Sequence, residues 1–275
     1  MIGYGAVGSN SSATQSRRMQ FMAPWAGLSE RALQPEVMDQ PGLDPQLHGQ
    51  ALRALARINL LSRSADILYP PIRDLARHLG GGPLSILDLA SGGGDVTIAL
   101  WQRLRRSGIA ARIVGRDKSP TAVEIARQRA AQLGADVEFA IGDVLEPAGD
   151  EWFDVVVSSL FMHHLDRSDA VRLLEHMKHA ARHLALVNDL ERSRLGYALA
   201  VAVTQLVSRS PVVHVDGPRS VEGAFSLREA QRLAADADMQ GAVIRRRWPC
   251  RFLLSWTSRV PAGGEGSACG NATSL

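Results

Sequence analysis

The chain of 275 residues is poor in the features that build disulfide frameworks and membrane spans. Its two cysteines, Cys250 and Cys269, are too few for a cysteine-bridged scaffold and favour a reducing compartment. The longest apolar run, residues 196–207, is interrupted by Thr204 and Gln205 and falls short of the roughly 18 residues that a membrane span needs. No charged segment followed by an apolar core opens the chain, so we expect no signal peptide. The sequence therefore predicts a cytoplasmic location and no membrane span.

Lysine is also scarce, and this weakens the case for a nucleic-acid partner. Among the 31 lysines and arginines, Lys118 and Lys178 are the only lysines. Such an arginine bias fits codon preference in a G+C-rich genome, and the net charge is only +3. The densest basic run, residues 245–247, lies in an apparent strand context and not along a basic stripe. We therefore predict no nucleic-acid binding.

Composition and apolar spacing divide the chain into four parts. We expect a flexible N-terminal arm, a helical cap, a main domain and a disordered tail, at residues 1–35, 36–82, 83–260 and 261–275. In the arm, residues 3–8 read G-x-G-x-x-G, but no strand precedes them and no helix follows, so we do not interpret them as a nucleotide site. In the cap, Pro70 and Pro71 are expected to break or kink a helix.

The main domain alternates strand-like and helix-like segments. The expected strands are residues 85–88, 111–115, 136–140, 153–158, 184–187, 242–248 and 251–256. Because helices separate most of the early strands, the order predicts an α/β fold with a parallel sheet flanked by helices. Residues 191–224 predict a lid insertion, with an apolar helix followed by a loop over residues 210–224.

The stretch SILDLASGGGD, residues 85–95, organises this domain. A short apolar strand ends at Asp88, three glycines follow, and a helix begins at Asp95. Glycines let the backbone approach a ligand, and a helix N-terminus offers unpaired N–H groups. The stretch therefore predicts a ligand-binding turn, which by itself is compatible with a phosphate or a dinucleotide.

Five successive segments of the sequence indicate which ligand this turn binds. In order and spacing, ILDLASGGG, VGRDKS, FAIGDV, FDVVVSSLFMHHL and LALVND resemble the motifs of class I S-adenosylmethionine-dependent methyltransferases. The likeness covers roughly residues 50–257 and is to free-standing small-molecule members of the ubiquinone/menaquinone and polyketide types. It implies a Rossmann-like sheet, mostly parallel with an antiparallel last strand. It also implies S-adenosylmethionine as the cofactor and S-adenosylhomocysteine as its product.

The resemblance also implies which residues hold the cofactor. It assigns the methionine end to Asp88 and the glycine turn, the ribose hydroxyls to Asp117, and the adenine to Asp143 and the N–H that follows. Ala90 stands where the family has its first glycine, so we expect a negative φ there. The full predicted set is Asp88, Ala90, Gly92, Gly94, Asp117, Lys118, Gly142, Asp143, Val144 and Ser159.

Histidines near the strand ends are the candidates for acid–base chemistry. O-methylation requires a phenol or enol to lose a proton, and an imidazole titrates near neutrality. His163 and His164 follow the fourth strand and are candidate bases, although such a pair can also simply cap a helix and pack. His214, in the expected loop, is the third candidate, and Asp189 is placed to contact the acceptor. We predict no metal, because no acidic set suggests one.

The apolar character of the predicted lid indicates the kind of acceptor, and several alternative functions remain compatible with the sequence. The apolar lid favours methyl transfer to a small, largely apolar aromatic or polyketide-like molecule, with oxygen preferred and C-methylation of an activated ring as the alternative. The lid helix also fits a core or homodimer contact. A catalytically silent cofactor-binding partner in a biosynthetic complex is a second alternative. A dehydrogenase is disfavoured, because Thr97 stands where a dinucleotide turn needs Gly or Ala.

Overall fold

The computed structural model describes residues 26–37, 44, 46, 49–51, 53–54, 57–58, 63–146, 151–208 and 210–258. The principal elements, in chain order, are η1 (Ala26–Ser29), α2 (Ser64–His78), β1 (Leu84–Leu89), α3 (Asp95–Arg106), β2 (Ala111–Asp117), α4 (Pro120–Leu133), β3 (Glu138–Ile141), β4 (Phe153–Ser159), η3 (Met162–His164), α5 (Arg167–Ala180), β5 (Ala181–Leu190), α6 (Arg194–Val207), α7 (Pro211–Gly223), α8 (Leu227–Asp236), β6 (Val243–Arg247) and β7 (Arg251–Thr257). Predictions for residues 1–25, for most of residues 38–62 and for the tail 261–275 lie outside the described residues.

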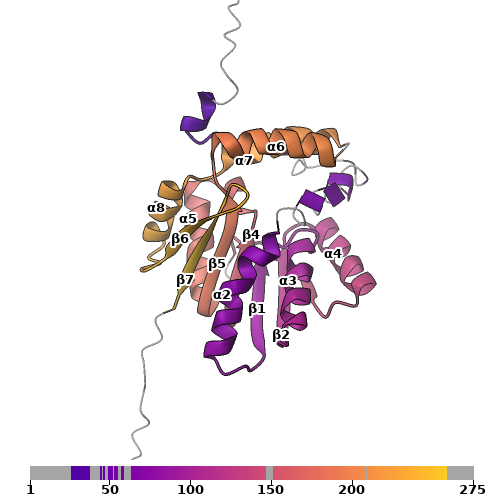
Figure 1. Ribbon diagram of the computed structural model, residues 1–275, viewed down its shortest axis with the longest axis vertical. Helices are drawn as coiled ribbons and strands as arrows, with labels where there is room; N and C mark the ends of the chain where they lie inside the picture. The colour runs from indigo at the N-terminus through magenta and orange to yellow at the C-terminus, as the bar shows by residue number, and fades with distance from the viewer. Residues whose placement is uncertain are drawn as a thin grey trace, which may run out of the picture.

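A single sheet of seven strands forms the centre of the domain, in the order β3-β2-β1-β4-β5-β7-β6 (Figure 1). The pairs β1–β2, β1–β4, β2–β3 and β4–β5 are parallel, whereas β7 is antiparallel to both β5 and β6. The predicted α/β fold, mostly parallel with an antiparallel end, is confirmed. In such a sheet the carboxyl ends of the parallel strands meet at one edge, where ligands bind.

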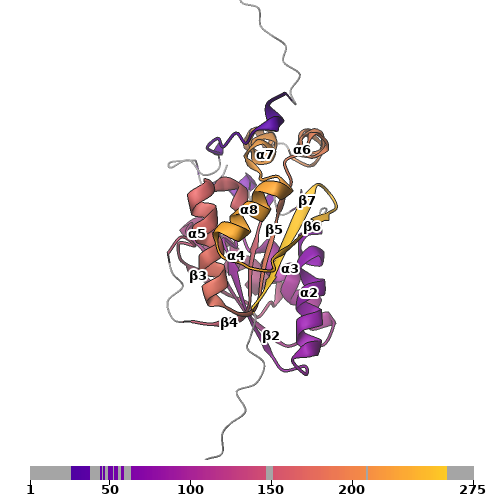
Figure 2. The same cartoon turned by 90° about the vertical axis from the view of Figure 1, so that its left-hand side faces the viewer.

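Two hydrophobic cores cover the two faces of the sheet. Ile86 and Val155 pack on one face with the apolar sides of α2 and α3. Leu87 and Val156, the next residues along the same strands, pack on the other face with α5 and α8. Figure 2 shows these two helix layers on opposite sides of the strands. Alternating side-chain direction explains why these strands are apolar without a break, since both faces are buried.

Helix α2 continues across Pro70 and Pro71, so the predicted break is wrong. Leu68 and Ile72, on either side of the prolines, are fully buried against the sheet. A proline inside a helix costs about 3 kcal/mol, whereas burying a large apolar side chain contributes about 1.5–3 kcal/mol. Packing of several such side chains therefore offsets the two prolines.

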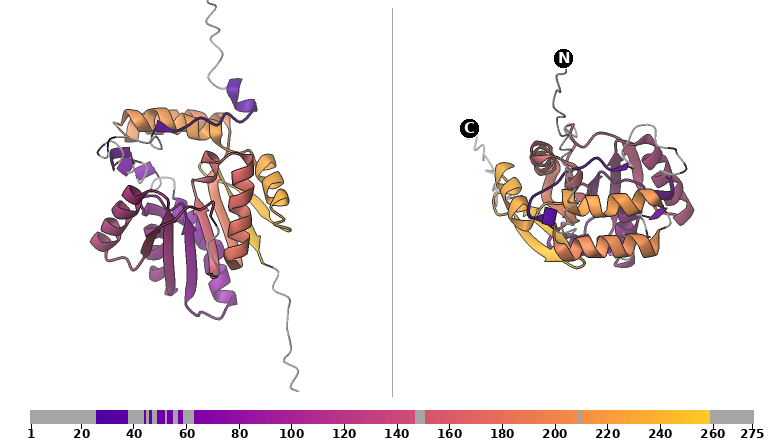
Figure 3. Two further views of the ribbon diagram at one scale, coloured as in Figure 1. Left: turned by 180° about the vertical axis from the view of Figure 1, so that it is seen from behind. Right: turned by 90° about the horizontal axis from the view of Figure 1, so that it is seen from above.

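The lid consists of α6 and α7, which lie across the carboxyl end of the sheet (Figure 1). From above, the two helices run side by side over the strands (Figure 3). The loop predicted over residues 210–224 is wrong, because α7 occupies this segment. Pro211 lies at the first turn, where its fixed φ favours a helix. Gly217, a residue typical of loops, instead lies against Thr204 of α6.

The close approach of the two lid helices depends on Gly217. A Cβ at this position would lie 2.5 Å from Thr204 Cγ2. We expect Gly217→Ala to lower the free energy of unfolding by about 1–3 kcal/mol, because overpacking outweighs the helix propensity gained. Urea unfolding measures the change. Adding Thr204→Ser, which deletes the methyl group and keeps the hydroxyl, should restore most of the loss; an unchanged midpoint for Gly217→Ala alone would contradict the close packing.

An N-terminal strap, residues 31–37, is bonded to the lid. The Ala32 N–H donates to the Glu222 carbonyl at 3.1 Å, and the Val37 N–H donates to Asp216 Oδ1 at 2.8 Å. The half-buried Arg31 guanidinium donates to the carbonyls of His163 and Leu165. The prediction of a flexible arm as far as residue 35 is therefore wrong at this end of the arm. Within the described part of the chain, no helix combines the length and apolar character that crossing a membrane requires.

Candidate active site

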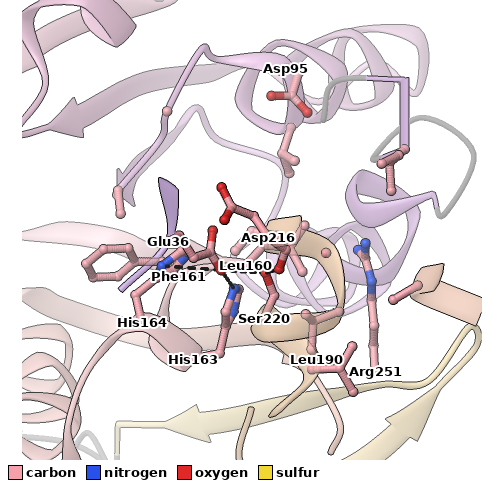
Figure 4. Close-up of a pocket in the computed structure, with 18 of the residues that line it drawn as sticks. Glu36, Asp95, Leu160, Phe161, His163, His164, Leu190, Asp216, Ser220 and Arg251 are labelled. Carbon is pink, nitrogen blue, oxygen red and sulfur yellow. Dashed lines mark hydrogen bonds and ion pairs between the residues drawn. The ribbon is translucent and has the colours of Figure 1, made fainter. Parts of the chain in front are cut away.

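A cavity of about 630 Å³ lies between the carboxyl end of the sheet and the lid. Its floor is the glycine turn and the ends of β2 and β4, and its roof comes from α6 and α7. All but four of the predicted site residues line it, the exceptions being Gly94, Gly142, Asp189 and His214. Figure 4 shows the histidine side of this cavity, where side chains from the strap, η3 and α7 point toward one another.

The turn after β1 is left-handed at three positions. Ala90 has φ 59°, Gly92 has φ 53° and Gly94 has φ 73°. The expected negative φ at Ala90 is wrong. The turn brings the Ser91 N–H to the Arg116 carbonyl of β2 at 3.0 Å, and alanine adopts the left-handed conformation at a cost of roughly 1–2 kcal/mol.

The two outer glycines serve different needs. A Cβ on Gly92 would meet nothing within 4 Å, and this residue lines the cavity. A Cβ on Gly94 would lie 2.7 Å from Phe139 Cζ and 2.9 Å from Ala126 Cβ. Gly92 therefore leaves room for a ligand, whereas Gly94 is required by packing.

Asp88, at the end of β1, is a buried carboxyl group with one unused acceptor. Thr97 Oγ1 donates to its Oδ2 at 2.6 Å, and Oδ1 has no hydrogen-bond partner among the described residues. Burial raises the pKa of Asp88 to about 7, against the opposing effect of the Thr97 hydrogen bond. A cationic ligand group at Oδ1 would favour the ionised form. The role of Thr97 was missed from the sequence.

Asp117 joins the glycine turn to the start of α4. Its Oδ2 accepts from the Gly92 N–H at 2.8 Å, and its Oδ1 accepts from the Ser119 N–H at 2.9 Å. A carboxylate can accept about four hydrogen bonds, so acceptor capacity remains on both oxygens. The carboxylate is therefore held in place and faces the cavity, as a ligand for a vicinal diol should be.

Three further residues predicted to bind the cofactor line the cavity together with Asp117, and a fourth lies behind them. Lys118 and Asp143 are exposed at the cavity edge, and Val144 is buried in its wall. Asp143 Oδ1 accepts from the Leu145 N–H at 2.9 Å, which fixes its turn. Gly142 lies behind them and donates its N–H to the Asp117 carbonyl.

Ser159 ends β4 and lines the middle of the cavity. Its Oγ accepts a hydrogen bond from Asn188 Nδ2 at 2.8 Å. This bond connects the ends of β4 and β5.

His163 and Asp189 form the central pair on the histidine side of the cavity. The two side chains are 5% and 1% exposed, and His163 Nδ1 lies 2.6 Å from Asp189 Oδ1. Asp189 also accepts the His163 backbone N–H at 3.0 Å and the Leu190 N–H at 2.7 Å. Burial opposes ionisation of Asp189, but the charge and hydrogen bond of His163 and the backbone donor keep its pKa below the ordinary value. The carboxylate therefore fixes the ring and directs Nε2 away from itself, toward the cavity.

Glu36, carried by the strap, faces the histidine pair from the opposite side (Figure 4). Its Oε1 lies 3.9 Å from His163 Nε2 and 3.8 Å from His164 Nδ1, and Ser220 of α7 donates to the same oxygen. We expected no metal from the sequence, yet these three side chains place possible ligand atoms within 4.8 Å of one another. Glu36 was missed because it lies far from the histidines in sequence and belongs to a segment without a motif.

His214 does not reach the cavity. It lies on α7, and its Nε2 is 2.7 Å from the Ser208 carbonyl, a bond that closes the connection between the lid helices. Its neighbours Val213 and Asp216 line the cavity instead. Arg251, buried at the start of β7, also lines the cavity and was not predicted; burial lowers its pKa to about 10.

Comparison with known proteins identifies the central part of the chain. A family model described as "Methyltransferase domain" matches residues 86–183. A demethylmenaquinone methyltransferase from Thermus thermophilus is 38% identical over 98 residues, 35% of this chain and 42% of the relative. A ubiquinone biosynthesis O-methyltransferase from Brucella anthropi is 30% identical over 128 residues, 46% of this chain and 49% of the relative. A release factor glutamine methyltransferase from Geobacter sulfurreducens is 36% identical over 75 residues, 27% of this chain and 25% of the relative. The chain thus spans half or less of the length of these curated relatives.

Solved structures share the fold. Mitomycin 7-O-methyltransferase has a TM-score of 0.56 at 19% identity, with 78% of this chain and 59% of that chain covered. A SAM-dependent methyltransferase from Aquifex aeolicus has a TM-score of 0.52 at 19% identity, with 78% and 98% covered. These likenesses cover more of the chain than the matched domain does. Residues 86–183 thus match a methyltransferase domain, and the chain shares its fold with solved methyltransferases.

Proposed function

We propose that the protein transfers a methyl group from S-adenosylmethionine to an oxygen atom of a small, largely apolar aromatic or polyketide-like acceptor. The observation that carries this proposal is the buried His163–Asp189 pair, whose second ring nitrogen, 3.9 Å from Glu36 Oε1, faces the same cavity that the glycine turn lines. A proton acceptor on the acceptor side is what an oxygen nucleophile requires.

The cofactor end of the cavity fits S-adenosylmethionine. Asp88 presents a buried, unpartnered oxygen suited to an ammonium group, and Asp117 keeps acceptor capacity for the ribose hydroxyls. Gly92 leaves the space that a ligand passing the turn needs. When bound, the cofactor supplies an electrophilic methyl group on a sulfonium. We assign Asp88, Gly92, Asp117, Asp143 and Val144 to this end.

His163 is the residue that we assign to accept the acceptor's proton at Nε2. Asp189 holds the opposite ring nitrogen, so it fixes the ring and stabilises the imidazolium that forms. The remaining contribution of the protein is positional. The mostly apolar cavity beneath the lid keeps the acceptor oriented toward the methyl group, which lowers the barrier without further chemistry.

The lining of the roof supports an apolar acceptor. Leu199 and Val203 of α6, Val213 and Val221 of α7, and Phe161 face the cavity. Polar groups are concentrated near His163, so one polar end of the acceptor would lie there and the rest would contact hydrocarbon. Two partial relatives are named for menaquinone and ubiquinone methylation, and such names support an aromatic acceptor of this kind.

Calorimetry and a turnover assay test the proposal in two steps. The purified protein should bind S-adenosylmethionine, and absence of binding would exclude the proposed reaction. A panel of phenolic acceptors, analysed by mass spectrometry, should then give an O-methyl product. A C-methyl product would favour ring methylation instead, and binding without turnover on any acceptor would favour a catalytically silent partner protein.

Zinc is expected to inhibit the reaction. The ion would bind Glu36, His163 and His164 and so occupy the ring nitrogen needed as base. Asp189→Asn should weaken zinc binding by about 10- to 100-fold, because a carboxylate behind a histidine ligand orients it. Calorimetry with zinc chloride measures the affinity, and EDTA should restore turnover. Equal zinc affinity in wild type and His164→Gln would contradict this site.

A further inference from the structure

Helix α6 is apolar on the side that faces solvent as well as on the side that lines the cavity. Leu199 and Val203 face inward, whereas Leu195 is 56% exposed, Val201 39% and Leu206 85%. The exposed residues, with Ala198 and Ala202 between them and Gln205 as the one polar member, form a band along the helix that we call the α6 outer face. A helix on the surface of a protein in water normally presents polar residues there.

An exposed tryptophan extends this face at one end. Trp248, in the turn between β6 and β7, is 75% exposed. The segment that joins β6 to β7 packs against the N-terminal turn of α6, since a Cβ on Gly196 would lie 3.2 Å from Cys250 Cβ. An indole next to an apolar helix face is the arrangement that peripheral proteins use at lipid interfaces.

Arginines border the same end. Arg194 begins α6, and Arg245 and Arg247 precede Trp248. None of the three forms an ion pair with another residue that the structure describes. A second copy of the chain on a twofold axis would bring two such sets of arginines together, whereas an anionic surface would neutralise them.

The cavity opens at this face. Leu206 and Trp248 both line the cavity and are both strongly exposed, so the rim of the acceptor site belongs to the apolar surface. We propose that the α6 outer face and Trp248 dock on an anionic lipid surface, from which the cavity takes an apolar, membrane-dissolved acceptor. The delivery of the acceptor rests on the proposed function, but the docking itself does not.

Sedimentation with vesicles tests the docking without any turnover. The full chain should bind vesicles of phosphatidylcholine mixed with phosphatidylglycerol and bind vesicles of phosphatidylcholine alone weakly. Leu195→Glu with Val201→Glu should weaken binding by roughly tenfold or more, because apolar burial is lost. Arg194→Gln and Arg247→Gln should weaken it by about fivefold each. Leu133→Glu is the matched control, since Leu133 is also an exposed leucine, 53%, but lies on α4.

Three outcomes would overturn the proposal. These are equal binding to the two vesicle types, unchanged binding by the Leu195→Glu, Val201→Glu variant, and a stable dimer in ultracentrifugation that this variant dissociates. A dimer that the variant dissociates would show that the α6 outer face binds a second copy of the chain. Calorimetry with S-adenosylmethionine on the same variant should give wild-type affinity, so a failure of the proposed function is distinguishable from a failure of docking.

Discussion

Replacement of His163 by glutamine is expected to lower kcat for methyl transfer by about 10²- to 10⁴-fold, the usual contribution of a positioned base. The ring nitrogen Nε2 faces the cavity while Asp189 holds Nδ1 at 2.6 Å, so glutamine removes the proton acceptor without removing the polar contact. The Kd for S-adenosylmethionine should remain near the wild-type value, because the residues assigned to the cofactor lie at or just after the ends of β1, β2 and β3 and not on η3. Steady-state kinetics and calorimetry measure the two quantities.

Two further variants separate a chemical role from a structural one. Asp189→Asn should lower kcat while leaving the KM for the acceptor nearly unchanged, because Asp189 positions the ring and does not touch the acceptor. His214→Gln should turn over at close to the wild-type rate, since its ring bonds the Ser208 carbonyl outside the cavity. Wild-type turnover by His163→Gln would remove His163 from the mechanism.

The sheet and the glycine turn were predictable because their signals are local. An apolar strand, a run of glycines and a helix start follow one another within residues 85–95, and further strands follow in alternation with helices. The carboxyl ends of parallel strands meet at one edge, so topology alone brings Asp88, Asp117 and Ser159 to one cavity.

Contacts distant in sequence account for what the sequence could not predict. Glu36 reaches His163 because the strap is bonded to α7, and no periodicity in residues 31–37 indicates this. Gly217 resembles a loop residue until Thr204 is seen to pack against it. The left-handed backbone of Ala90 follows from the hydrogen bond of the next residue to β2, a constraint of the sheet and not of the local sequence.

Asp88 should make cofactor affinity depend on pH. Burial raises the pKa of this carboxyl to about 7 in the unliganded protein, and only the ionised form attracts an ammonium group. The affinity for S-adenosylmethionine should therefore increase between pH 6 and 8, by about tenfold per pH unit below the pKa. Asp88→Asn should bind weakly at every pH, because the amide carries no charge. Calorimetry across this range measures the dependence, and an identical pH profile in wild type and Asp88→Asn would contradict it.

The same carboxyl should make the unliganded protein less stable as pH rises. The ordinary value is 3.8 and the folded value about 7, so between these values the folded state retains a proton that the unfolded chain has lost. The free energy of unfolding then falls as pH increases, by of order 4 kcal/mol once pH exceeds 7. Asn at this position can still accept the Thr97 hydroxyl but never ionises, so Asp88→Asn should lack this decline and exceed wild-type stability at pH 8 in urea unfolding. A variant that is more stable yet fails to bind the cofactor would show that Asp88 is kept for its charge and not for packing, because a purely structural residue would lose both together.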